Sequence, residues 1–464
     1  MPTDADLAFA PLPFLAAKLR AGEFSSVELT TFFLDRLETH GPKYHCVVTI
    51  TRELALEQAT EADAALKAGR DLGPLHGIPY GAKDLLATKG IPTSWGAEPY
   101  RRRLIDHDAT VVRKLREAGA VLIAKLSMVE IAGGMGYRQP NASLTGPGLN
   151  PWDVERWSGG SSSGSGSAVA AGLVPFAIGS ETIGSINSPS SCCGITGLRP
   201  TYGRVSRAGA MALSWTLDKI GPMARTAHDC GLILEAIAGP DPDDPSAADR
   251  PFRRGSAGPP GRKYKLAVIK NGQNGVQTEV KNHFERAVDV FKSFATIEEV
   301  DVPTWPMGLL SGTILGAEMA SAFEEMLDAG ENFDLTAPED RLGGFASQTI
   351  LATEYLRAQR LRAKVCKEYD AFLAPFDAVL TVGRAGTAAK IKQGLGKPFN
   401  ARTLIVEGNV CGTPALTLPM GLDDEGIPTS LQIDGRAYAE STVLTLGAAF
   451  QEATAWHQSH PKVG

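Results

Sequence analysis

Residues 158–185 read SGGSSSGSGSAVAAGLVPFAIGSETIGS, a block of serine and glycine that continues directly into apolar sequence. A flexible linker could resemble its first nine residues, but a linker does not continue as AVAAGLVPFAI. Small residues next to apolar ones indicate a backbone that passes close to another part of the fold. We therefore expect strand, turn and helix here, with the hydroxyls of Ser161 and Ser185 placed for chemistry.

Helices and strands alternate along the chain ahead of this block. Ser25 and Glu28 form a capping-box pattern at the start of a helix. A second helix is predicted over residues 52–68, with a glycine at its end, and residues 77–86 (GIPYGAKDLL) predict a short strand.

The next elements continue the alternation. Asp108 is expected to cap a helix that ends at Gly119, and residues 120–124 (AVLIA) predict a buried strand. Such an order implies an α/β architecture around a largely buried sheet.

The later part of the chain is less regular. Residues 239–262 are rich in Pro, Asp and Gly and predict a loop, and residues 305–400 predict a helical region with one long helix over 347–372. Residues 411–421 return to strand character. A closing amphipathic helix is expected to bury Val443, Leu446 and Phe450.

Composition excludes several classes of protein. The chain has 464 residues, 43% of them hydrophobic, which is enough for a sizeable core. Its net charge of -6 argues against a nucleic-acid-binding surface. The longest apolar run falls short of a membrane span, and the N-terminus carries acids where a signal peptide has Lys or Arg. We expect a cytoplasmic protein without a membrane partner.

Six cysteines fit a reducing compartment. They contain no CxxC pair, and no histidine stands near the adjacent Cys192 and Cys193 to complete a metal-ligand cluster. We expect buried thiols, with no metal site and no disulfide framework.

Two general catalytic motifs fit the serine block poorly. A phosphate-binding loop ends in Gly-Lys-Ser/Thr, whereas no lysine occurs between Lys125 and Lys219. A nucleophile elbow, G-x-S-x-G, matches formally around Ser162, with Asp218 and His228 as possible partners. A sequence this rich in Gly and Ser produces that match by chance.

A third interpretation rests on a resemblance. The serine block together with GITGLRPTYGRVSR at 194–207 resembles the amidase signature family. The similarity covers most of residues 20–235 and resumes at about 405. Further matching segments occur in the family's order: AGEFSSVEL (21–29), GIPYGAKDLL (77–86), DATVVRKLREAGAVLIAKLSMVE (108–130), NPWDVERWSGGSS (150–162), LDKIGPMARTAHD (217–229) and CGTPALTLPMG (411–421).

The resemblance implies a fold and a domain organisation. The expected fold is a mixed, mostly buried twisted sheet sandwiched by helices, in one domain spanning residues 1–464. Residues 70–240 and 405–464 would form the catalytic core, and residues 305–400 a variable region that shapes the substrate pocket.

The resemblance also implies a Ser-Ser-Lys catalytic set. The matching residues are Lys83, Ser161 and Ser185, with Ser185 as nucleophile and Ser161 as the relay. In the family the peptide bond before the relay serine is cis, here Gly160–Ser161. The two serines are 24 residues apart, as in family members (185 − 161 = 24).

Lysine can act as a base only when it is neutral, and its ordinary pKa is about 10.4. The pKa of Lys83 must fall by about three units for this, which corresponds to roughly 4 kcal/mol. Burial among apolar neighbours can supply that shift. Asp84 points to the opposite face if this segment is a strand, so it need not cancel the effect.

The family's oxyanion hole consists of successive backbone N–H groups, which match Thr182, Ile183, Gly184 and Ser185. Ile183 replaces the first of two glycines, and a positive φ would strain an isoleucine. Either the loop conformation tolerates the isoleucine, or its side chain shapes the acyl pocket, and we favour the second explanation.

Two further differences concern the substrate. Members that handle charged acyl groups often carry Arg where this chain has Asn187, so a neutral, apolar or aryl amide is expected, with Met135 and Asn187 as substrate-binding residues. The tRNA-dependent amidotransferase A-type chain carries an acidic residue about seven positions before an Asn that matches Asn409. Arg402 stands there instead.

These residues together predict a stand-alone amidase, a monomer or homodimer that needs no cofactor. Carbamates (urethanes) and esters are further candidate substrates, because the same acyl chemistry serves them. The alternative is an amidotransferase A-type subunit that acts on glutamine in a complex.

Overall fold

A computed structural model describes residues 4–255, 262–396 and 399–463. Eleven of its strands form one mixed sheet in the order β1-β3-β2-β6-β8-β7-β12-β13-β11-β9-β10, and β4 and β5 form a separate pair. The strands are β1 Val47–Ile50, β2 Pro79–Lys83, β3 Val121–Leu126, β4 Leu149–Asn150, β5 Asp153–Trp157, β6 Ala177–Glu181, β7 Thr196–Arg199, β8 Lys219–Ala224, β9 Tyr264–Ile269, β10 Ala295–Val300, β11 Ala378–Val382, β12 Ala415–Leu422 and β13 Pro428–Asp434.

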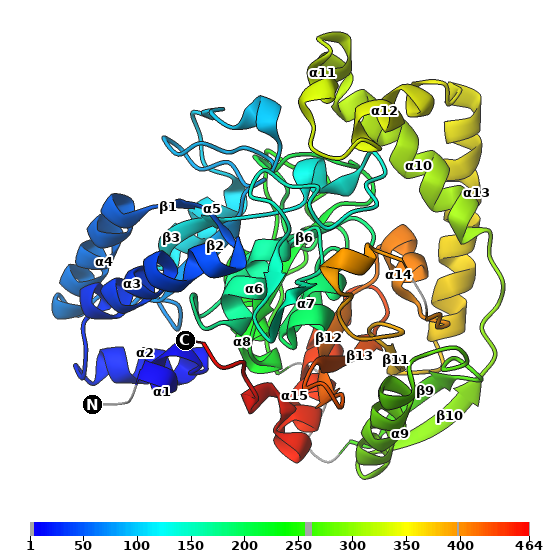
Figure 1. Ribbon diagram of the computed structural model, residues 1–464. Helices are drawn as coiled ribbons and strands as arrows, with labels where there is room; N and C mark the ends of the chain where they lie inside the picture. Colours follow the sequence, from blue (N-terminus) through cyan, green and yellow to red (C-terminus); the bar gives the residue numbers. More distant parts are fainter. Residues whose placement is uncertain (1–3, 256–261, 397–398, 464) are drawn as a thin grey trace.

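Helices surround the sheet (Figure 1). They are α1 Asp4–Ala8, α2 Leu12–Arg20, α3 Ser26–Tyr44, α4 Arg52–Lys67, α5 Thr110–Glu117, α6 Ser163–Ala170, α7 Asn187–Cys193, α8 Ala227–Ile237, α9 Thr278–Lys292, α10 Met307–Ala322, α11 Glu324–Asp328, α12 Asp340–Gln348, α13 Ala352–Leu373, α14 Ile405–Cys411 and α15 Glu440–Thr454. None of the helices in the described ranges is long and apolar enough to cross a membrane.

The sheet carries helices on both faces, as the resemblance implies. On β12, Leu416 packs against Gly447 of α15, whereas the hydroxyl of the next residue, Thr417, accepts a hydrogen bond from Asn187 of α7. Successive strand residues point to opposite faces, so α15 and α7 cover opposite sides. Strands β2, β3, β8, β11 and β13 are buried along their whole length. The predicted α/β fold with a mostly buried mixed sheet is confirmed.

Most of the local predictions are confirmed. In the capping box of α3 the Ser25 hydroxyl accepts from the Glu28 N–H at 3.1 Å, and the Glu28 carboxylate accepts from the Ser25 N–H at 2.7 Å. The predicted cap at Asp108 is wrong. Ala109 is the N-cap of α5, and the Asp108 carboxylate accepts a hydrogen bond from the Lys89 N–H at 2.7 Å. This contact to the preceding loop takes the carboxylate away from the helix end.

Residues 305–400 contain more than the predicted helices. Helices α10 to α13 lie here, and α13 matches the predicted long helix apart from its first residues. The region also contributes β11, which lies between β13 and β9 in the main sheet. The predicted loop over 239–262 lies partly outside the described residues, and its described part holds no helix or strand. The division into catalytic core and pocket region stays a prediction.

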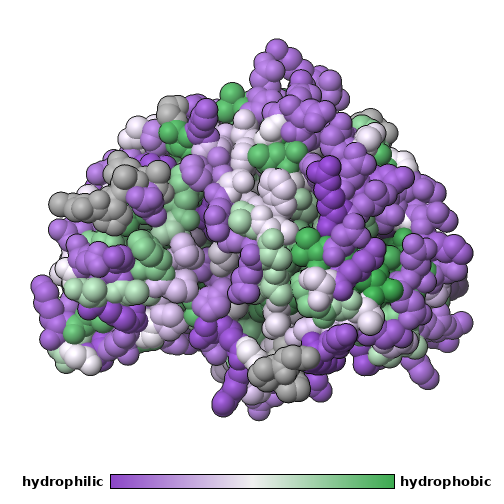
Figure 2. All heavy atoms as spheres, turned by 90° about the horizontal axis from the view of Figure 1, so that it is seen from below, coloured by the Kyte–Doolittle hydropathy of each residue, from purple (hydrophilic) through white to green (hydrophobic). Residues whose placement is uncertain are grey.

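One face of the molecule is shown in Figure 2. Hydrophilic residues cover most of its rim, and hydrophobic residues gather in smaller groups nearer the middle. The chemistry that the sequence predicts therefore has to be sought at the ends of the buried strands.

Candidate active site

The register of β2 and β6 brings the ends of two strands together. The strands run parallel and pair Gly81 with Ala177 and Ala82 with Ile178. Lys83 and Ser180 therefore lie at the carboxyl ends of neighbouring strands, where loops converge in α/β folds.

Lys83 is fully buried, and its partners are hydroxyl groups. Its Nζ donates to Ser161 Oγ at 2.8 Å and to Ser180 Oγ at 2.9 Å. Burial lowers the pKa of Lys83 to about 7, although Asp218 and Glu181 act in the opposite direction. A substantial fraction of this amine is therefore neutral near pH 7.

Asp84 does not neutralise Lys83. Its carboxylate lies 3.1 Å from the buried Lys125 ammonium and accepts hydrogen bonds from the N–H and hydroxyl of Ser94. The expectation that Asp84 points away from Lys83 is confirmed. No sequence pattern indicated the second buried lysine at position 125.

Ser161 lies between the end of β5 and the start of α6. The Gly160–Ser161 peptide bond is cis, as the resemblance implies. The Ser161 carbonyl accepts from the Val129 N–H at 3.0 Å, and the side chain is 1% exposed.

Ser185 lies in the turn between β6 and α7 and is partly exposed. Its carbonyl accepts from the Ser162 N–H at 3.3 Å, so this turn is joined to the segment that carries Ser161. Within the described ranges the Ser185 hydroxyl makes no hydrogen bond to Ser161. The structure thus brings Lys83 and Ser161 into contact and places Ser185 on the adjoining turn.

The backbone of this turn leaves donors unoccupied. Among the described residues, the N–H groups of 182–185 donate no hydrogen bond, whereas those of Ile186 and Asn187 both donate to the Glu181 carboxylate. Gly184 has a φ of 98°, and Ile183 is not among the residues with positive φ. The strain considered for Ile183 therefore does not arise.

A cavity of about 420 Å³ adjoins these groups. Ser180 and Thr182 form part of its wall, and Ser180 is one hydrogen bond away from Lys83 Nζ. Apolar side chains contribute much of the remaining lining, among them Leu85, Met211, Leu213, Trp215 and Ile220. Sequence reasoning missed this contribution of residues 202–220, because lining residues carry no motif of their own.

The two predicted substrate-binding residues lie elsewhere. Met135 is buried in the hydrophobic core. Asn187 donates from Nδ2 to Thr417 Oγ1 at 2.8 Å and to Gln432 Oε1, so both of its amide hydrogens are engaged. A substrate contact through Asn187 would have to use its oxygen, and the substrate-binding role of both residues stays a prediction.

The nucleophile-elbow alternative finds no support in the geometry. The Ser162 hydroxyl donates to the Ser180 carbonyl at 3.2 Å and accepts from the Ser180 N–H at 3.3 Å. Asp218 accepts from the Thr182 hydroxyl at 2.6 Å and from the N–H groups of Leu213 and Ser214. Both side chains hold the strand end and the turn in place.

The comparisons agree with this geometry. The family model described as Amidase matches residues 28–444. The A chain of the glutamyl-tRNA(Gln) amidotransferase of Picosynechococcus sp. is 35% identical, covering 97% of this chain and 99% of that protein. The native peptide amidase of Stenotrophomonas maltophilia has a similar structure, with a TM-score of 0.87 and 29% identity, covering 99% of both chains.

The corresponding chain of the glutamyl-tRNA(Gln) amidotransferase from Thermotoga maritima is a further structural neighbour, with a TM-score of 0.73 and 30% identity over 84% of this chain and 87% of that one. The chain therefore belongs to the amidase signature family. Enzymes of this family hydrolyse carbon–nitrogen bonds of amides.

Proposed function

We propose that this protein is a stand-alone amidase that hydrolyses neutral apolar or aryl amides through an acyl-enzyme. Ser185 is the nucleophile, Ser161 and Lys83 carry its proton, and the N–H groups of residues 182–185 form the oxyanion hole. The observation that supports this most is the buried Lys83, whose Nζ lies 2.8 Å from Ser161 Oγ.

The proton path follows from the charge state of Lys83. Neutral Nζ can accept the Ser161 hydroxyl proton across the same distance, and Ser161 then takes the proton of Ser185 as its Oγ attacks the carbonyl carbon. The two serines thus transfer one proton to Lys83. Burial supports this role because it makes the amine neutral near pH 7.

The unoccupied N–H groups supply the electrostatic part of catalysis. Negative charge develops on the carbonyl oxygen when the tetrahedral intermediate forms, and fixed donors stabilise it. Lys83 then returns its proton through Ser161 to the departing amine, and the carbon–nitrogen bond breaks. Water attacks the ester of Ser185 by the same relay and releases the acid.

The lining of the cavity supports a neutral substrate. Leu85, Met211 and Leu213 provide apolar surface beside Ser180. The acidic Asp218 in the wall is already bonded to Thr182. Carbamates and esters with similar acyl or aryl groups are candidate substrates too, since their carbonyl carbons undergo the same attack.

The second candidate function is that of an amidotransferase A-type subunit that uses glutamine in a complex. The names of the curated relatives favour it. Arg402 argues against it, because it stands where those amidotransferase chains carry an acid and pairs with Glu407 at 2.7 Å. A monomer or homodimer in the cytoplasm fits the stand-alone proposal.

Assay of the purified chain alone separates the two functions. We expect release of aniline from neutral acyl anilides without any partner protein, little glutaminase activity, and loss of several orders of magnitude in Ser185→Ala. Carbamates of the same aniline measure the carbamate preference. Glutamine hydrolysis with no turnover of any anilide or carbamate would overturn the proposal.

A further inference from the structure

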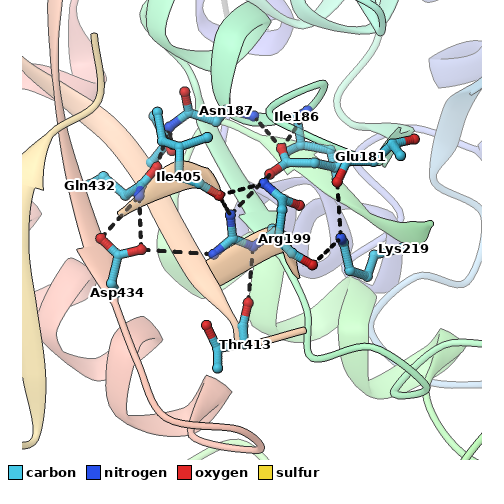
Figure 3. A network of polar contacts seen from close by, with 12 residues as sticks. Glu181, Ile186, Asn187, Arg199, Lys219, Ile405, Thr413, Gln432 and Asp434 are labelled. Carbon is cyan, nitrogen blue, oxygen red and sulfur yellow. Dashed lines mark hydrogen bonds and ion pairs between the residues drawn. The ribbon is translucent and has the colours of Figure 1, made fainter. Parts of the chain in front are cut away.

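Glu181 is a buried carboxylate directly ahead of the proposed oxyanion turn (Figure 3). One oxygen accepts from the Ile186 N–H at 2.8 Å and the Asn187 N–H at 2.9 Å. The other accepts from Arg199 Nη1 at 3.1 Å and Asn409 Nδ2 at 2.8 Å. Four donors from three other parts of the chain thus converge on one side chain that is 0% exposed.

The surroundings keep Glu181 ionised. Burial alone would raise its pKa, but Arg199, the Asn187 N–H, Lys219 and the Asn409 amide together lower it below its ordinary value. An ionised carboxylate accepts hydrogen bonds on both oxygens, and bonds to charged groups are the stronger ones.

The two backbone bonds define the shape of the turn. They connect the last residue of β6 to the two residues that follow Ser185, so residues 182–185 form a closed loop held at its base. Inside this loop the N–H groups of 182–185 are left without partners among the described residues. Asn409 also bonds to the Ile405 carbonyl at 2.9 Å, and Ile405 lies over Gly184.

We propose that Glu181 is a positioning residue that holds the Ser185 turn in its reactive shape through the Ile186 and Asn187 N–H groups. This inference rests on the proposed function. Glu181 does not touch the reacting atoms, and it acts through the orientation of Ser185 and the neighbouring donors. Displacement of catalytic groups by about 1 Å can cost 10²-fold in rate.

The test uses Glu181→Gln in the full chain. The amide keeps the shape but replaces one accepting oxygen with a donor, which faces either two N–H groups or Arg199 and Asn409. We expect kcat per active site to fall about 100-fold with KM within about threefold. Active sites are counted by the burst of p-nitrophenol from an acylating ester.

Glu440→Gln is the matched control. Glu440 is also 0% exposed, accepts from the Thr201 N–H at 2.9 Å and pairs with the buried Arg204 at 3.0 Å. This pair makes none of its contacts with residues 181–187, so the variant should lose stability and keep its kcat per titrated site. A purely structural role for Glu181 would give the same result in Glu181→Gln and would overturn the inference.

Asn409→Leu covers the case in which Glu181→Gln does not fold. It removes one donor to Glu181 and preserves the Arg199 ion pair, and we expect kcat per site to fall about tenfold. An unchanged kcat per site in Asn409→Leu would overturn the inference. If the wild type gives no burst that depends on Ser185, the proposed function itself fails, independently of Glu181.

Discussion

Lys83, Lys125 and Lys219 are the lysines buried in the described part of the chain, and their partners differ. Lys125 pairs with Asp84, and Lys219 donates to the carbonyls of Thr182, Leu217 and Asn409. Lys83 instead faces two hydroxyls. A carboxylate would hold its proton and a carbonyl cannot supply one, so hydroxyl partners are what a proton-accepting lysine requires.

The pH dependence of the reaction should report the charge of Lys83. Below its pKa of about 7 the amine is protonated and cannot accept the Ser161 proton. We therefore expect kcat/KM for a neutral anilide to rise about tenfold per pH unit below pH 7 and to level off above it. A profile that stays flat between about pH 5.5 and 8.5 would contradict the assignment.

Replacement of Lys83 by Met should abolish turnover and stabilise the fold. Between pH 7 and 10.5 the unfolded chain binds a proton at Lys83 that the folded chain lacks, so wild-type stability rises with pH there. At pH 7 the burial penalty is about 5 kcal/mol at 1.36 kcal/mol per unit. Part of it is offset by the hydrogen bonds that Met loses.

Denaturant unfolding of wild type and Lys83→Met at pH 7 and pH 9.5 measures this effect. We expect the variant to be more stable by about 1–3 kcal/mol at pH 7, with a smaller difference at the higher pH. A variant that is less stable at pH 7, or a difference that does not change with pH, would show that Lys83 is not buried at such a cost.

At the scale of elements, α6 explains why the serine block is so poor in large side chains. All eight residues of the helix are buried. A Cβ added at Gly164 would lie 2.4 Å from the Cys46 carbonyl oxygen and 2.5 Å from the Ser127 nitrogen, both backbone atoms. The helix therefore packs with its backbone against the neighbouring segments, and this packing fixes the position of Ser161 just ahead of it.

Gly164→Ala should consequently disturb both stability and activity. Backbone atoms cannot move aside cheaply, so we expect a loss of about 2–4 kcal/mol and a lower kcat per active site. Gly312→Ala on α10 is the control, because nothing lies within 4 Å of its added Cβ and alanine favours the helix. Thermal unfolding in which both variants behave alike would contradict the close packing of α6.

At the scale of the whole molecule, the sequence predicted what depends on neighbours in the chain. The capping box at Ser25, the buried strand at 120–124 and the close packing of the serine block follow from local pattern, and the catalytic set followed from the resemblance. Strand β11 was missed because five buried residues after a long helix give no separate signal. Its place between β13 and β9 depends on contacts distant in sequence.

The Glu181 network was missed for the same reason. Its members come from β6, α7, β7 and α14, and no spacing rule connects positions 181, 187, 199 and 409. An acidic residue at the end of an apolar strand was the one available signal. The pairing of Lys83 with Ser161, by contrast, joins two motifs that the sequence displays openly.

The most direct test of the proposed mechanism is the identity of the acylated residue. Wild-type protein mixed with a p-nitrophenyl acyl ester, quenched in acid within the burst and digested, should carry the acyl group on Ser185. Ser185→Ala should carry none, and Lys83→Met should acylate far more slowly at the same residue. An acyl group on Ser161 or another side chain, or steady turnover without any acylated protein, would contradict the central claim.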